Sequence, residues 1–126
     1  MVSHPGWSRS SVINLFVDEA LRMAEHPGVV FRDGPTGRRA VLMGGPDVRE
    51  VIRAVRSARA GEPELDADAI VALVSANTGV PARLAETAIR YWSAYPDEID
   101  LWIEETETFE ERALRSWERR QDLLAR

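Results

Sequence analysis

The sequence predicts a mainly α-helical protein, with a small β-hairpin and a helical bundle that contains a helix-turn-helix, followed by a long C-terminal helix. Three observations support this fold class. Apolar residues recur every three or four positions over most of the chain, which is the spacing of amphipathic helices. Two short apolar runs within residues 28–46 flank a glycine- and proline-rich turn, as in a hairpin. After Pro96, neither glycine nor proline interrupts the chain.

The first helix and the hairpin are expected in the N-terminal third. Ser10 and Ser11 precede a periodic apolar segment and are good N-cap residues, while His26-Pro27-Gly28 ends that segment. Residues 29–31 and 40–43 are the strand candidates. Because two such strands are only marginally stable alone, we expect a helix or a partner chain behind them.

Three shorter helices follow the hairpin. Pro46 suits the first turn of the second helix, which ends in a loop at residues 60–64. A third helix covers residues 66–76, and a tight break at residues 77–81 leads to a fourth helix that ends near Ala94. The apolar residues that we expect to be buried in these helices are Val48, Val51, Ile52, Val55, Ile70, Leu73, Val74, Leu84, Ala88, Ile89 and Trp92.

The last helix is predicted to be about thirty residues long, or roughly 45 Å. A helix of this length protrudes from a small domain, so its far half must bury its aromatic residues on another chain or bend back. We therefore divide the chain into an N-terminal helix at residues 1–27, a hairpin and helix-turn-helix core at residues 28–95, and a partner-binding helix at residues 96–126.

The composition is that of a globular protein. The chain has 126 residues, of which 44% are hydrophobic and 29% are charged, enough for one domain with its own core. There is no cysteine, which excludes disulfides and thiolate metal sites. No run of about twenty apolar residues is present, so we expect a cytoplasmic protein without membrane contact.

The charge is unevenly distributed. Residues 1–60 contain nine arginines and six acidic residues, whereas residues 61–126 contain seven arginines and fifteen acidic residues, and there is no lysine. Guanidinium groups suit both phosphates and carboxylates. A basic front half and an acidic rear half favour two surfaces with different partners, and ordinary solvated helix faces are the alternative.

Residues 70–92 have the form of a helix-turn-helix, in which Gly79 permits the left-handed turn between the helices. If the motif reads DNA, its second helix enters the major groove, where Arg83, Thr87 and Arg90 contact the duplex. The alternative is a structural helical corner, because two arginines neutralise few phosphates.

A second candidate for phosphates or for an acidic protein is a basic patch on the hairpin and the second helix. An ordinary solvated helix face is the alternative. The arginines of this predicted patch are Arg38, Arg39, Arg49, Arg53 and Arg56.

Aromatic residues make the C-terminal helix a candidate interface. Trp102, Phe109 and Trp117 are spaced by seven and eight residues and so lie on roughly one side of a helix. Aromatic residues beside arginine are typical of protein-interface anchors. The alternative is a buried intramolecular seam with heptad-like spacing, formed by Ile99, Trp102, Thr106, Phe109 and Ala113.

The sequence offers no catalytic constellation. His4 and His26 are far apart and do not form a ligand pair, and the serines near the N-terminus have no obvious base. The glycines fit turns better than a phosphate-binding loop. We therefore expect a protein that is not an enzyme and that holds neither a cofactor nor a metal ion.

Residues 28–52, followed by Tyr91-Trp-Ser-Ala-Tyr-Pro-Asp-Glu-Ile99, resemble the bacterial family called domain of unknown function 433. In that family a hairpin leads to a helix and a helix-turn-helix, and the segment closes on a turn rich in tyrosine, proline and acidic residues. The resemblance covers about residues 26–103. Many members resemble antitoxins of the VapB type, often beside a toxin of the PIN ribonuclease type.

A second resemblance lies upstream, where residues 6–22 look like the second helix of a ribbon-helix-helix repressor. In that family the turn before this helix offers backbone N–H groups to a DNA phosphate. The resemblance places Ser8, Arg9 and Ser10 at that position and implies duplex DNA as a partner.

These features together predict an antitoxin-like regulator that forms a homodimer, neutralises a cognate PIN-type toxin and regulates its own operon. The toxin would dock on Trp102, Phe109 and Trp117. The resemblance to antitoxins of PIN ribonucleases implies that Arg115 or Arg119 enters the acidic metal site of the toxin. Two alternatives stay open: a DNA-binding regulator without a toxin, and a structural adaptor whose long helix dimerises with itself.

Overall fold

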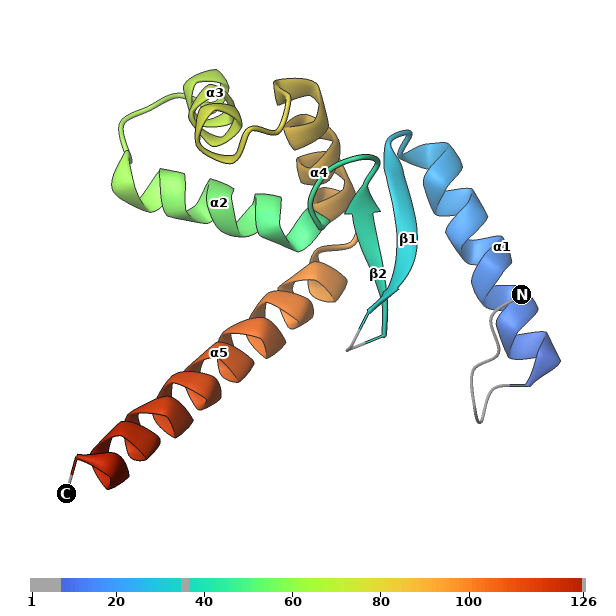
Figure 1. The fold of residues 1–126 in the computed structure, drawn as a ribbon. Coiled ribbons are helices and arrows are strands. Elements are labelled where there is room, and N and C mark those ends of the chain that lie inside the picture. The colour runs from blue at the N-terminus through green and yellow to red at the C-terminus, as the bar shows by residue number, and fades with distance from the viewer. Residues whose placement is uncertain (1–7, 35–36, 126) are drawn as a thin grey trace.

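The computed structural model describes residues 8–34 and 37–125. The protein is mainly helical, with one two-stranded antiparallel hairpin and a long last helix, which confirms the predicted fold class (Figure 1). Its elements in chain order are α1 (Arg9–Glu25), β1 (Val29–Gly34), β2 (Gly37–Leu42), α2 (Val48–Gly61), α3 (Ala67–Thr78), α4 (Ala82–Ala94) and α5 (Pro96–Leu124).

Helix α1 begins slightly earlier than the sequence suggested. Ser8 is its N-cap, and the Ser8 Oγ accepts a hydrogen bond of 3.1 Å from the backbone N–H of Ser11. This bond satisfies one of the N–H groups that have no partner within the helix. The helix ends at His26, as predicted, and Gly28 follows with φ of 102°, a conformation that glycine adopts without strain.

The hairpin packs one face on the helices. Val29 pairs with Leu42, and Gly34 pairs with Gly37 at the turn, so both strands are longer than the predicted runs. Val29, Ala40 and Leu42 are fully buried because they face the core that α2 and α4 contribute. The expectation that a helix lies behind the hairpin is confirmed.

Helices α2, α3 and α4 pack against one another and form the main core. Asp66 caps α3 by accepting a hydrogen bond of 2.8 Å from the Ala69 N–H. Gly79 then adopts φ of 75°, in the left-handed region, and α4 begins after Pro81. The α3–turn–α4 unit is therefore the predicted helix-turn-helix. Buried Val74, Ala85 and Ala88 lie where its two helices approach.

Helix α5 divides into two halves. Its first turns belong to the core, since Ile99 and Ile103 are buried and the helix packs on α2. From Glu107 to Ala125 every residue is exposed, and this half projects away from the other elements (Figure 1). A boundary between residues 95 and 96 would therefore cut through the core.

In the described ranges, 8–34 and 37–125, no helix combines the length and the apolar character that crossing a bilayer requires.

Candidate partner-binding surface on the long helix

The apolar stripe that attaches α5 to the domain continues beyond the domain. Ile99 and Ile103 are buried, and Thr106 is half-buried one turn further on. Continuing the same spacing of three and four residues leads to Glu110, Ala113, Trp117, Arg120 and Leu124, of which three are apolar and two are charged. The distal half of α5 thus carries the same helix face into solvent, where no described element covers it.

Ion pairs hold the emerging helix in place. Arg53 on α2 donates two hydrogen bonds, of 3.2 and 3.1 Å, to the carboxylate of Glu110. Arg56 donates to Asp100 at 2.6 Å, and the indole N–H of Trp92 donates to the same oxygen at 2.9 Å. These two hydrogen bonds, the Trp92 bond first, lower the pKa of the Asp100 carboxyl. The direction of α5 is therefore fixed by side chains on both α2 and α4.

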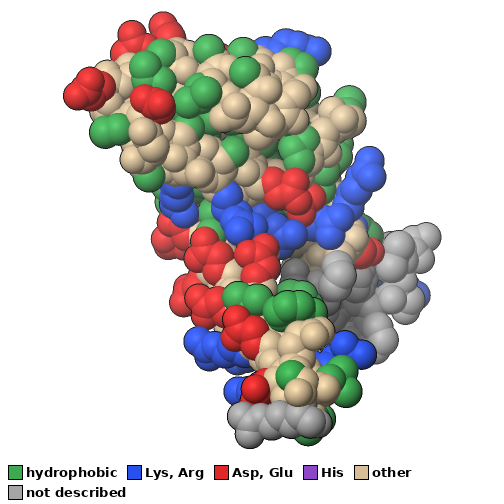
Figure 2. Space-filling model, turned by 60° about the vertical axis from the view of Figure 1, so that its left-hand side comes forward, with side chains coloured by type: hydrophobic (Ala, Val, Ile, Leu, Met, Phe, Trp, Pro, Cys, Tyr) green, Lys and Arg blue, Asp and Glu red, His purple; other side chains and the backbone are tan. Residues whose placement is uncertain are grey.

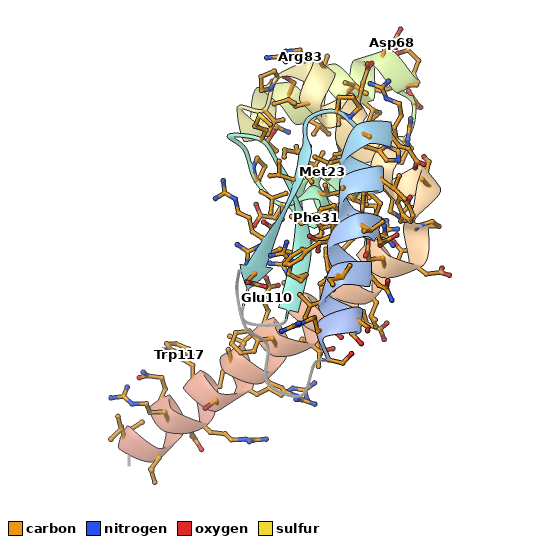
Figure 3. All side chains as sticks on the ribbon, turned by 90° about the vertical axis from the view of Figure 1, so that its right-hand side faces the viewer. Met23, Phe31, Asp68, Arg83, Glu110 and Trp117 are labelled. Carbon is orange, nitrogen blue, oxygen red and sulfur yellow. The ribbon has the colours of Figure 1, made fainter. Side chains whose placement is uncertain are left out.

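The projecting half exposes large apolar side chains. Phe109 is 72% exposed and Trp117 is 58% exposed, and Leu114, Leu123 and Leu124 are also exposed. Figure 3 labels Trp117 well beyond Glu110 along the helix, away from the rest of the molecule. Exposed side chains of this size, grouped on one part of a helix, are typical of a protein-binding interface.

Trp102 does not belong to this exposed surface. Its indole is half-buried and packs against the core cluster, so its placement beside Phe109 and Trp117 in one binding site is corrected. The reason is its position one residue before Ile103, on the part of α5 that still lies against the domain. The intramolecular seam is thus present on the first half of the helix, whereas the second half leaves its apolar side chains exposed.

The two arginines predicted for this site do not share the side of α5 that carries Trp117. Arg115 and Arg119 are exposed, but each is two positions from Trp117, and residues two apart on a helix point to nearly opposite sides. Arg120 is three positions from Trp117 and therefore lies on its side of α5. The sequence analysis missed Arg120, although this three-residue spacing was already visible.

The predicted basic patch is neutralised by carboxylates that lie beside its arginines. Arg38 forms a bidentate pair with Glu19 of α1, and Arg39 and Arg49 both lie beside Asp47, at 3.2 and 3.4 Å. Arg53 and Arg56 pair with α5, as above. Figure 2 shows basic and acidic side chains intermingled across this face. The patch is therefore neither an open phosphate site nor a merely solvated helix face.

The helix-turn-helix offers two free arginines. Arg83 and Arg90 are exposed, and within residues 8–34 and 37–125 neither makes an ion pair. Thr87 is buried, and its hydroxyl donates a hydrogen bond of 2.9 Å to the Arg83 carbonyl oxygen. The prediction that Thr87 faces DNA is therefore corrected, because its side of α4 packs inward near Gly28.

The proposed phosphate-binding turn before α1 is only partly described. Ser8 uses its Oγ as the helix cap, whereas Arg9 and Ser10 are exposed in the first turn. Residues 1–7, which include His4 and the beginning of the ribbon-helix-helix resemblance, lie outside the described residues.

A partly buried polar cluster joins α1, α4 and α5 around Tyr91. The Tyr91 hydroxyl donates to Glu98 Oε2 at 2.8 Å and accepts from Arg22 Nη1 at 3.0 Å, and Arg22 also contacts both Glu98 oxygens. Burial and the Glu98 hydrogen bond raise the pKa of Tyr91 well above its ordinary value. His26 packs edge-on against the same ring, at 5.3 Å between centroids. The sequence analysis missed this cluster, whose residues it placed in helices but did not connect.

A shallow groove lies between α2, α3 and α4. Its volume is about 820 Å³, and its apolar floor is formed by Val55, Ile70, Val71 and Ile89. Arg56, Arg59 and Arg90 line its edge together with Asp68 and Glu86. Arg59 is occupied by the carbonyl oxygens of Pro63 and Leu65, and Arg56 by Asp100, so Arg90 is the free cation of this edge among the described residues.

A comparison of the chain with protein-family models, curated proteins and solved structures gives no match.

Proposed function

We propose that this protein is a non-enzymatic binding protein of the antitoxin kind, which uses the distal half of α5 to dock on a partner protein. One observation carries the proposal: the apolar stripe that packs α5 on the domain continues past Glu110 through Ala113 and Trp117 with no described element over it. A stripe with this spacing is what a helix-in-groove interface requires.

The exposed apolar side chains on the distal half of α5 would supply the energy of binding. Fully burying an exposed side chain of the size of Trp117 or Phe109 contributes about 2–3 kcal/mol. Two such aromatic anchors with Leu114 and Leu124 beside them provide the central contact that interface energetics depend on. The helix is held by Arg53 and Arg56 before binding, which reduces the entropy lost on docking.

The partner we infer is a ribonuclease toxin of the PIN type, on the resemblance of residues 26–103 to the antitoxin-like family. Such an enzyme has an acidic metal site, and an antitoxin arginine inserted there would block it. Arg120 is the arginine on the side of Trp117 and takes this role in place of Arg115 and Arg119. The same proposal includes a cytoplasmic location of the protein and regulation of its own operon.

Co-expression with the product of the neighbouring gene, followed by co-purification and a ribonuclease assay, tests the proposal. We expect a stable complex in which ribonuclease activity is suppressed. Trp117→Ala and Phe109→Ala should each weaken the complex at least about tenfold, which corresponds to 1.4 kcal/mol. Arg120→Ala should restore ribonuclease activity, whereas the matched variant Arg115→Ala should not.

The absence of a complex, or a complex indifferent to Trp117→Ala and Phe109→Ala, would overturn this function. Circular dichroism of each variant provides the folding control, since these side chains are exposed and their removal leaves the core intact.

A DNA-binding regulator that acts without a toxin is the second candidate, favoured by Arg83 and Arg90 on α4, whose guanidinium groups form no ion pair with any residue that the structure describes. It predicts salt-dependent duplex binding that weakens in Arg83→Ala and Arg90→Ala. Thr87→Ser would leave such binding unchanged, because that side chain is buried. A structural adaptor, the third candidate, predicts instead that α5 pairs with α5 of a second copy.

A further inference from the structure

Helix α1 directs two ionic side chains, Glu19 and Arg22, toward the rest of the domain. Glu19 is 4% exposed, and its carboxylate accepts a hydrogen bond of 2.9 Å from the Nε of Arg38 on β2. Arg22 lies on the same side and reaches Tyr91 and Glu98. Val12 is buried there as well. The side of α1 that contacts the domain is therefore held largely by charged hydrogen bonds.

The opposite side of α1 is apolar and uncovered. Ile13, Val17 and Leu21 are 51%, 55% and 59% exposed, and they follow one another at intervals of four residues. Ala20 and Ala24 are exposed on the same side, and their small side chains permit a second helix to approach closely. A helix that is apolar on its outer side is ordinarily covered. Figures 1 and 3 show α1 at the edge of the molecule, with the hairpin on one side and no described element on the other.

The pattern of this outer face is self-complementary about Val17. If two α1 helices cross antiparallel at Val17, Ile13 of one copy faces Leu21 of the other, and Ser10 faces Ala24. The same register places Arg9, the first residue of α1, opposite Glu25, the last. Both side chains are exposed, and Arg9 makes no ion pair within the described residues.

A second copy explains these charges better than other occupants. A parallel pair of α1 helices would place Arg9 beside Arg9 and Glu25 beside Glu25, which is repulsive. A membrane surface favours helices with a strongly basic polar face, whereas the borders of this face carry Asp18 and Glu25 with one arginine. The antiparallel arrangement also opposes the two helix dipoles favourably.

We propose that two copies of this chain associate through the outer faces of their α1 helices, packed antiparallel about Val17, with Arg9 of each copy paired to Glu25 of the other. The proposal is independent of the partner of α5, because α1 and the distal half of α5 are separate surfaces. Association through one helix pair is small, so we expect a dissociation constant in the micromolar range, of about 1–100 µM.

Sedimentation equilibrium of the full chain over a concentration series tests this dimer. Val17→Glu should raise the dissociation constant at least about tenfold, because it places two carboxylates at the centre of an apolar contact. Leu114→Glu is the matched control, an exposed apolar residue of α5 given the same charge, and it should leave the dimer unchanged. Circular dichroism should show the same helix content for all variants.

Charge exchange tests the antiparallel register. Arg9→Glu alone should weaken the dimer, and Arg9→Glu combined with Glu25→Arg should restore it. A wild-type chain that stays monomeric throughout, a dimer lost with Leu114→Glu and kept with Val17→Glu, or a failure of the double exchange to restore association would each overturn the proposal. Toxin binding is measured separately, so either proposal can fail without the other.

Discussion

The carboxylate of Glu110 on α5 lies 3.1 Å from Nη2 of Arg53 on α2 and joins the two helices where α5 leaves the domain. Before this pair, α5 buries Ile99 and Ile103; after it, every described residue of the helix is exposed. One continuous helix therefore serves first as a core element and then as a projecting surface. The same stripe of side chains serves both purposes, so stability and binding should be separable by mutation along α5.

We predict that this separation appears when one apolar residue is truncated on each half. Ile103→Ala should lower the free energy of unfolding by about 2–4 kcal/mol, because it opens a cavity in the core. Leu114→Ala should change it by less than about 0.5 kcal/mol, because that side chain is exposed. Urea denaturation of the two variants measures both values. Similar losses in both would show that the distal half is packed on something within the free protein.

A second prediction compares two arginine–glutamate pairs of different burial. Arg38→Ala should cost about 3 kcal/mol, because it leaves the buried carboxylate of Glu19 without its partner. Arg53→Ala should cost less than about 1 kcal/mol, because both members of its pair are substantially exposed. Replacing Arg38 by Met and Glu19 by Leu together should recover much of the first loss. If Arg38→Ala proves as mild as Arg53→Ala, the carboxylate of Glu19 reaches water.

Alkaline titration should reveal the cluster around Tyr91. The folded state raises the pKa of Tyr91, mainly through burial and then through the Glu98 hydrogen bond, so the neutral phenol stabilises the fold. That contribution is complete below the ordinary tyrosine pKa of 10.0 and is lost as the pH rises above it. Urea unfolding at pH about 8 and about 10.5 should therefore show a smaller loss of stability in Tyr91→Phe than in the wild type. Tyr95→Phe is the control, with a smaller effect, because its ring is only half-buried. A loss of stability in Tyr91→Phe that is as large as the loss in the wild type would contradict the raised pKa of Tyr91.

The elements that the sequence predicted well are those fixed by local chemistry. Gly79 and Pro81 separate α3 from α4 as expected, since glycine adopts the left-handed turn and proline disfavours the helical conformation of the residue before it. Periodicity gave the buried face of α2, where Val48, Val51 and Ile52 are all buried. The lack of glycine and proline after Pro96 predicted the extent of α5 to within two residues of its end.

What the sequence could not predict depends on contacts between distant segments. The arginines at 38, 53 and 56 suggested a basic surface, and only the fold brings Glu19, Asp100 and Glu110 to them. The apolar periodicity of α1 does not say which side faces the domain, and the ion pairs of Glu19 and Arg22 decided it. Trp102 was assigned to the exposed surface for the same reason, because periodicity alone does not locate the edge of the domain.

Alanine substitutions at two glycines should change the stability of the fold in opposite directions, because the two glycines differ in backbone conformation. A Cβ added at Gly79 or at Gly61 meets no atom within 4 Å, so packing does not distinguish the two positions. Gly79 has φ of 75°, which a residue with a Cβ adopts only with strain, and Gly79→Ala should destabilise the fold by about 1 kcal/mol. Gly61 is the last residue of α2, and Gly61→Ala should stabilise the fold by about 0.5 kcal/mol, because alanine loses less entropy in a helix. Thermal and urea unfolding of both variants measure the difference, and a Gly79→Ala variant as stable as the wild type would show that the turn between α3 and α4 does not require a left-handed residue.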